Sequence, residues 1–194
     1  FMKKKMKARC VASCLAAVTV IGSAGIPAAA QETGEADAAQ TDAFVPEAKA
    51  DKGNFNTGWK FNLGDVENAD QKEFDDSGWE DIQIPHDFSM DQEFSAQYEA
   101  ESGFLPGGTG WYRKSVVFPE DYEGKTLTIN FDGVYNHAYV YVNGTKIGEN
   151  FYGYNDFSLD ITDYVTCDGK TENVISVKAV NEFPSSRWYS GSGI

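Results

Sequence analysis

Histidine is the side chain that most often acts as a general base near neutral pH, and the sequence contains two, His86 and His137. His86 lies in a Pro-His-Asp-Phe string, and His137 follows a Tyr-Asn pair. A nucleophilic triad needs such a base beside a serine, cysteine or threonine. Neither histidine falls within a recognisable nucleophile motif, so we interpret both as hydrogen-bonded structural residues.

Carboxylates are the second group that could do chemistry, and the chain has 30 Asp and Glu residues. Glycosidic cleavage needs two carboxyl groups roughly 5 to 9 Å apart, one of them kept protonated by an apolar pocket. The acidic residues here fall mostly in expected turns and at strand ends. Asp75-Asp76-Ser77-Gly78 predicts a turn with side-chain capping, followed by a core Trp79. We therefore predict no catalytic residues in this chain.

Signals for a metal or a phosphate group are also missing from the sequence. The twelve-residue calcium loop is absent. Cys167 is the one cysteine after residue 30, which excludes an internal disulfide and a cysteine-type zinc site in that part of the chain. The glycine-rich stretch at 107–110 lacks the lysine and the helix of a nucleotide loop. We predict no metal site and no cofactor within these residues.

The elements that must position any site are short strands separated by turns. Leu127, Ile129 and Phe131 alternate with polar residues and so share one face of a strand. Asn143-Gly144 suits a two-residue hairpin turn, because both turn positions need positive φ. No segment shows a sustained helical period. About seven strands are expected, over residues 59–63, 111–118, 126–132, 138–142, 145–147, 157–161 and 174–180, and they predict an all-β sandwich or jelly roll.

The first 53 residues differ in composition from the rest. A basic start, an apolar stretch from Val11 to Ile26 and an Ala-rich end predict a secretory signal peptide at 1–30. Residues 31–53 are acidic and poor in apolar side chains, which predicts a disordered spacer. The net charge of −14 disfavours nucleic acid and membrane surfaces as partners. We expect an exported bacterial protein, extracellular, at the cell surface or periplasmic.

An ordered series of motifs from residue 54 onward resembles the opening of glycoside hydrolase family 2 proteins, and most of all the bacterial β-galactosidase branch. One such string would be a weak signal, whereas the whole series in order is specific. The strings are WKFNLGD at 59–65, FDDSGW at 74–79, IPHDF at 84–88, GGTGWYRK at 107–114, FDGVY at 131–135, VYVNG at 140–144, YGYNDF at 152–157 and SRWYSGSGI at 186–194.

The resemblance implies that residues 54–194 form the N-terminal domain of a larger enzyme, a jelly-roll or galactose-binding-domain-like β-sandwich. In this family an immunoglobulin-like domain and a (β/α)8 barrel follow, and the barrel carries the two catalytic Glu residues. The family domain continues past the Ser-Gly-Ile string, so we expect the domain to be incomplete at its C-terminal end. The implied partners are these two domains, a β-galactoside-type oligosaccharide or glycan, and a second copy of the full-length protein.

The resemblance also implies a set of substrate-binding residues. In this family the loop before Ser-Gly-Ile reaches toward the sugar pocket of the barrel, which assigns substrate binding to Arg187, Trp188 and Tyr189. Packing between domains is the other interpretation of Arg187 and Trp188. The full-length enzyme could use a divalent or sodium ion. One sub-branch has a sodium-binding Asp at the position of Arg187, and a cation there counts against sodium binding by this loop.

Two functions follow from these observations. The first is the non-catalytic N-terminal domain of an exported, retaining glycoside hydrolase of the β-galactosidase type. The second is a free-standing extracellular carbohydrate-binding or adhesion module, because sandwiches with exposed aromatic residues bind glycans without catalysis and a fold does not fix a function.

Overall fold

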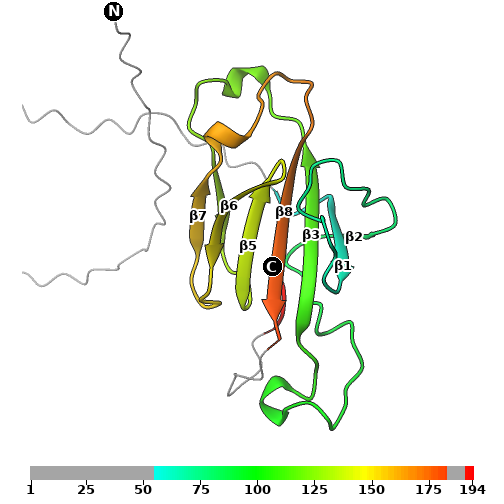
Figure 1. Cartoon of the computed structure of the whole chain (residues 1–194). Coiled ribbons are helices and arrows are strands. Elements are labelled where there is room, and N and C mark those ends of the chain that lie inside the picture. The colour runs from blue at the N-terminus through cyan, green and yellow to red at the C-terminus, as the bar shows by residue number, and fades with distance from the viewer. Residues whose placement is uncertain (1–54, 183–190) are drawn as a thin grey trace, which may run out of the picture. The chain divides into compact units, whose positions relative to one another are not determined.

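A computed structural model describes residues 55–182 and 191–194 of the chain (Figure 1). The predicted signal peptide at 1–30 and spacer at 31–53 lie outside this part. Within it, no helix is long and apolar enough to cross a membrane. The described strands are β1 (Trp59–Leu63), β2 (Glu80–Ile82), β3 (Gly108–Val116), β4 (Thr128–Phe131), β5 (His137–Val142), β6 (Thr145–Asn150), β7 (Phe157–Asp160) and β8 (Asn173–Asn181), and three one-turn 3-10 helices are η1 (Ala100–Ser102), η2 (Glu120–Tyr122) and η3 (Thr162–Tyr164). The prediction of an all-β fold is confirmed.

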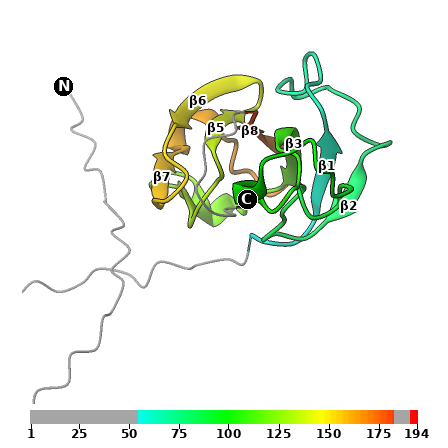
Figure 2. The same cartoon turned by 90° about the horizontal axis from the view of Figure 1, so that it is seen from below.

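The strands form two antiparallel sheets. The larger sheet has the order β2-β1-β3-β8-β5-β6, and β4 pairs with β7 in a two-stranded sheet. The longest ladder joins β3 and β8, from Gly108 opposite Asn181 to Val116 opposite Asn173. Seen from below, the strands surround a common centre (Figure 2). This is the sandwich that the alternating sequence pattern predicts.

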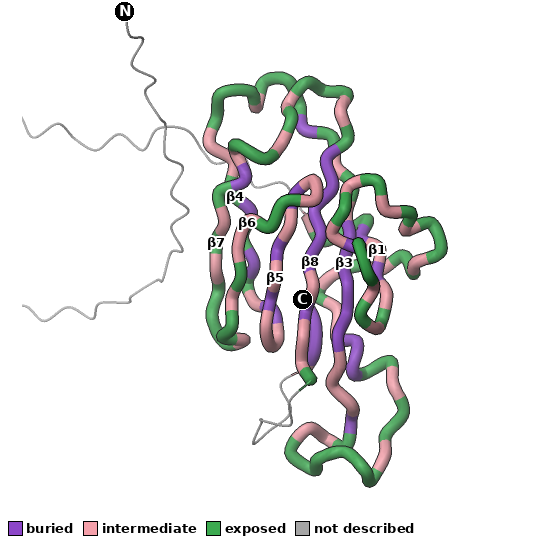
Figure 3. Tube along the Cα trace, viewed as in Figure 1, coloured by how far each residue is buried: buried purple, intermediate pink, exposed green. Residues whose placement is uncertain are grey.

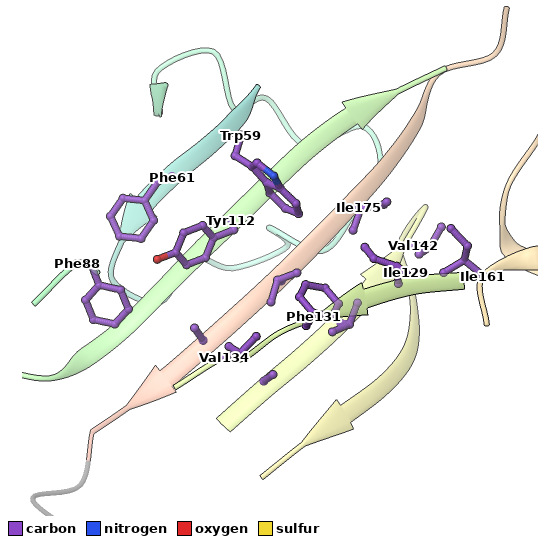
Figure 4. Close-up of a cluster of buried hydrophobic side chains, with 14 of the residues drawn as sticks. Trp59, Phe61, Phe88, Tyr112, Ile129, Phe131, Val134, Val142, Ile161 and Ile175 are labelled. Carbon is purple, nitrogen blue, oxygen red and sulfur yellow. The ribbon is translucent and has the colours of Figure 1, made fainter. Parts of the chain in front are cut away.

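The core lies between the two sheets. On β5 the burial alternates residue by residue, so that Ala138, Val140 and Val142 point inward. Phe61, Phe88 and Tyr112 pack together at one end of the core, with ring centroids of Phe61 and Tyr112 4.9 Å apart (Figure 4). Strand β8 departs from alternation, because five successive residues from Asn173 to Val177 are buried (Figure 3). A strand buried on both faces must be covered on each side.

Residues 64–79 cover the outer face of the larger sheet, and Arg113 on β3 holds them there. This arginine is 1% exposed, and its Nε donates to the Asp76 carboxylate over 2.7 Å. Its Nη1 donates to the backbone oxygens of Ala69 and Gln71 and to the Ser176 hydroxyl, and its guanidinium lies over the Phe74 ring. Trp111, Tyr112 and Arg113, three successive residues of β3, are all buried.

Two turn predictions are tested by the backbone. Asn143 and Gly144 have φ values of 49° and 82°, which confirms the two-residue hairpin between β5 and β6. The Asp75 carboxylate accepts the backbone N–H of Ser77 over 3.0 Å, which confirms the capped turn. The prediction that Trp79 is a core residue is wrong. Trp79 is half-buried and packs against Phe74, because it belongs to the covering segment outside the sheet.

Candidate functional site around residues 85–91 and 191–194

An open cavity of about 330 Å³ lies where three segments of the chain meet beside Gly153, a volume at the lower end of ligand pockets. It is lined by Pro85, His86, Asp87, Gly133, Val134, Tyr135, Gly153, Gly191, Ser192, Gly193 and Ile194. Backbone hydrogen bonds fix these walls. The N–H of His86 donates to the oxygen of Ile194 over 2.7 Å, and Tyr135 and Gly193 exchange two bonds of 2.9 and 3.0 Å. Residues 192–194 thus lie as a short strand between the other two segments.

Ser192 is the centre of a buried hydrogen-bond network. Its N–H donates to the Asp87 carboxylate over 2.8 Å, and the Asn181 amide donates to its hydroxyl over 2.8 Å. The hydroxyls of Ser192 and Ser89 are 2.7 Å apart, and that of Ser89 donates to the oxygen of Pro106. Ser192 is 2% exposed. Asp87, Ser89 and Asn181 are therefore bound directly to Ser192, and Pro106 is bound to it through Ser89.

Gly193 is required by the narrow space beside the cavity. Its φ is +135°, a backbone conformation that residues with a side chain rarely adopt. A Cβ at this position would overlap the carbonyl oxygen of His86 and the hydroxyl of Tyr112. The short strand can pass between these two groups only as glycine.

His86 connects the cavity wall to the core. Its Nε2 lies 3.0 Å from the Asp91 carboxylate, which can only accept, so Nε2 carries a proton. In the neutral ring Nδ1 then accepts from the Tyr112 hydroxyl over 2.9 Å. Burial, together with the charge of Asp87, raises the pKa of Tyr112 well above its usual value. The hydrogen bonds expected of His86 are therefore present.

The remaining candidate groups show no arrangement for bond cleavage in the part of the chain that the structure describes. His137 packs edge-on against Phe151, with ring centroids 5.0 Å apart. Burial raises the pKa of the Cys167 thiol, which favours its neutral form. Among residues 55–182 and 191–194, no three His, Cys, Asp or Glu side chains gather into a metal site.

The predicted substrate-binding residues Arg187, Trp188 and Tyr189 lie outside the described residues. The residues on both sides of this segment are described. Before it, Asn181 donates to Ser192 and to the oxygen of Gly191, and Glu182 accepts from Thr109 over 2.6 Å. The bonds of Asn181 bring the two flanks of the segment together at the end of β8, and that of Glu182 ties the first flank to β3.

Sequence reasoning missed the hydrogen-bonding roles of Asp87, Asn181 and Ser192. Asp87 and Ser192 are 105 positions apart, so no local pattern could have joined them. The sequence offers only an indirect signal for this contact. The Pro-His-Asp and Ser-Gly-Ile strings both belong to the motif series, but the series does not show that they touch.

Comparison with known proteins agrees with this architecture. The family model described as glycosyl hydrolases family 2, sugar binding domain, matches residues 53–193. The chain is 42% identical over 147 residues to the β-galactosidase BoGH2A of Bacteroides ovatus, a match that covers 74% of this chain and 17% of that protein. It is 35% identical over 133 residues to a β-glucuronidase of Formosa agariphila, covering 66% of this chain and 13% of that protein.

A solved structure shows the same fold. The crystal structure of a glycosyl hydrolase family 2 member from Bacteroides cellulosilyticus superimposes with a TM-score of 0.70 and 40% identity. The match covers 72% of this chain and 19% of that one. The chain thus spans less than a fifth of the relatives that it matches. Because the family model covers nearly all of the chain from residue 53 onward, the chain belongs to glycoside hydrolase family 2 through its sugar-binding domain.

Proposed function

We propose that this chain is the non-catalytic N-terminal domain of a retaining glycoside hydrolase of the β-galactosidase type. The observation that carries the proposal is the family match over residues 53–193, together with the short share of each relative that the chain spans. In this proposal the sandwich has jelly-roll topology, and it borders the active site of a (β/α)8 barrel that supplies both catalytic Glu residues. An immunoglobulin-like domain lies between the two, and the substrate is a β-galactoside-type glycan.

The part of the domain that borders the sugar is, in this proposal, the segment with Arg187, Trp188 and Tyr189. An arginine can donate two parallel hydrogen bonds to sugar hydroxyls, and an indole can stack on the apolar face of a pyranose. The network around Ser192 supports this role, because it ties both flanks of the segment to the core. Because both flanks are anchored, the segment between them can take fewer positions.

The proposal extends to export and to ions. Residues 1–30 act as a signal peptide and residues 31–53 as an acidic spacer, so the mature enzyme works outside the cytoplasm, in the periplasm or at the cell surface. The composition of these two stretches supports this. A divalent or sodium ion would belong to other parts of the full-length enzyme, because Arg187 replaces the sodium-binding Asp of one sub-branch.

The test is a comparison of the full-length gene product with the chain of residues 54–194. The full-length protein should hydrolyse 4-nitrophenyl β-galactoside faster than the matching glucuronide, and the chain alone should hydrolyse neither. Trp188→Ala should raise KM more than it lowers kcat, because stacking acts on the bound substrate. Trp79→Ala, at a half-buried tryptophan of the covering segment, is the matched control.

Two results would contradict the proposal. Turnover by the chain of residues 54–194 would place catalytic groups within it. A gene that encodes no barrel, combined with galactoside binding by the chain, would make the protein a free-standing carbohydrate-binding module instead.

A further inference from the structure

Residues 89–106, between β2 and β3, form a loop that projects past the ends of β3 and β8, and we call it the acidic loop for its charge (Figure 1). The Ser89 hydroxyl donates to the backbone oxygen of Pro106 over 2.7 Å and closes the loop at its base. Further out, the N–H of Ser95 donates to the backbone oxygen of Phe104 over 3.0 Å. Compact loops whose ends are joined in this way are frequently functional.

The acidic loop turns three aromatic rings toward solvent, and most of its length is exposed (Figure 3). Phe94 is 69% exposed, Tyr98 42% and Phe104 45%. With about 200 Å² for a whole aromatic side chain, the exposed parts amount to roughly 300 Å². A standard protein interface takes about 800 Å² from each partner, of which somewhat more than half is apolar. The three rings would supply most of that apolar share.

The backbone of Phe104 gives a second sign of a binding role. Its φ is +62°, a left-handed conformation that a bulky residue rarely adopts. Its N–H donates to the oxygen of Glu99 over 3.0 Å, which helps to hold this conformation. The ring gains little burial in return, because nearly half of it is exposed. Strained residues of this kind are concentrated at functional sites.

The charge of the loop decides which kind of partner fits it. The loop contains no Lys or Arg, and its charged residues are Asp91, Glu93, Glu99 and Glu101. A second copy fits poorly, because a two-fold contact would place this surface against itself and the whole chain carries a net charge of −14. The complementary partner is a protein surface with an apolar area bordered by Lys or Arg.

The base of the loop shares a network with the strand at 192–194. The hydroxyl of Ser89 lies 2.7 Å from that of Ser192, so the loop and this strand lie at the same end of the sandwich. In the proposed function, the segment before Ser192 borders the sugar in the catalytic barrel. The matched part also makes up less than a fifth of the relatives' length, which leaves room for such a partner in one polypeptide.

We propose that the acidic loop docks the sandwich onto the catalytic barrel of the same polypeptide, at an apolar surface bordered by Lys or Arg. The proposal rests on the proposed function for the presence of the barrel. Because Ser89 and Ser192 are bonded, docking of the loop also fixes where the strand at 192–194 lies beside the barrel.

The experiment is carboxyl labelling of the full-length protein with a carbodiimide and glycinamide, followed residue by residue with mass spectrometry. Glu93, Glu99 and Glu101 are exposed in this chain. In the full-length protein they should react about tenfold or more slowly than in the same protein unfolded in urea, since the docked state should predominate.

Two variants of the full-length protein test the apolar and the charged contacts. Phe94→Ala and Glu101→Lys should each raise the labelling rate of Glu99 severalfold, because each removes one part of the complementarity. Val117→Ala is the matched control, at an exposed apolar residue beyond the other end of β3, and it should leave the rate unchanged. Thermal unfolding will verify that all three variants fold.

The proposal is wrong if the three glutamates react as fast in the folded full-length protein as in the unfolded one. Protection that disappears on dilution would assign the loop to contact between copies instead. Protection that neither Phe94→Ala nor Glu101→Lys reduces would also refute docking through these contacts. Turnover of 4-nitrophenyl β-galactoside by the same preparation separates the two proposals. A reactive loop in an active enzyme refutes docking alone, and a protected loop in a protein without turnover refutes the proposed activity alone.

Discussion

The guanidinium of Arg113 should be the largest single polar contribution to the stability of the domain. Arg113→Met keeps most of the side-chain volume but removes the donors to Asp76, to the Ala69 and Gln71 oxygens and to Ser176. Removing one partner of a buried ion pair costs about 3–5 kcal/mol. Asp76 retains 26% exposure and can regain water, so we expect about 3–4 kcal/mol.

Urea unfolding measures this loss directly. With a slope of about 2 kcal/mol/M, the midpoint should fall by about 1.5–2 M. Lys60→Met is the matched control, since Lys60 lies opposite Arg113 on β1 and pairs with the exposed Asp81 over 2.8 Å. It should cost less than about 1 kcal/mol. A loss below about 1 kcal/mol for Arg113→Met would refute the reasoning, because it would mean that water replaces the guanidinium without penalty.

Three further substitutions test the site and its electrostatics. Gly193→Ala should destabilise the domain by more than about 3 kcal/mol in urea unfolding, because its Cβ overlaps two fixed oxygens; a smaller loss would mean that the short strand can shift. The pKa of Tyr112 is raised above 10.0 in the folded state, so stability should fall as the pH rises above 10.0, and Tyr112→Phe should flatten that slope in melts recorded across this range. The hydrogen bonds from Lys178 and Trp111 lower the pKa of Asp65 below 3.8, so its contribution is present above 3.8 and is lost as the pH falls further. Asp65→Asn should therefore reduce the urea midpoint at neutral pH more than at acidic pH, by a small amount because the carboxylate is 63% exposed, and an equal reduction at both would contradict the assignment.

The strands that face the core could be predicted from the sequence, because alternation reports burial on one face. The prediction of 59–63 agrees with β1, and that of 138–142 agrees with β5 except for His137. Strand β2 was missed because its three residues, Glu80–Ile82, carry no apolar alternation and are strand only through pairing with β1.

Strand β3 shows where composition misleads. The prediction began it at Trp111, whereas it begins at Gly108, because glycine has a low strand propensity. The fold needs glycine at position 110, since a Cβ there would crowd the rings of Phe61 and Phe88. The position of Trp79 was also mistaken, because a tryptophan after a turn suits the core and a covering segment equally well.

The candidate site could be predicted only in its motifs. The strings around His86 and Ser192 belong to the motifs by which the sequence resembles its family. The network that joins Asp87, Asn181 and Ser192, however, depends on contacts between positions up to 105 residues apart. Such contacts exist only after the sheets have assembled.

The two outer strands of the larger sheet bear on how the protein behaves at high concentration. One edge strand, β2, is three residues long. The other, β6, is disrupted by a register shift opposite Val140 and Tyr141, and it carries the charged pair Lys146 and Glu149. Short, bulged and charged edge strands are poor templates for pairing with a strand of another molecule. This sheet should therefore resist fibrillar stacking during expression and storage.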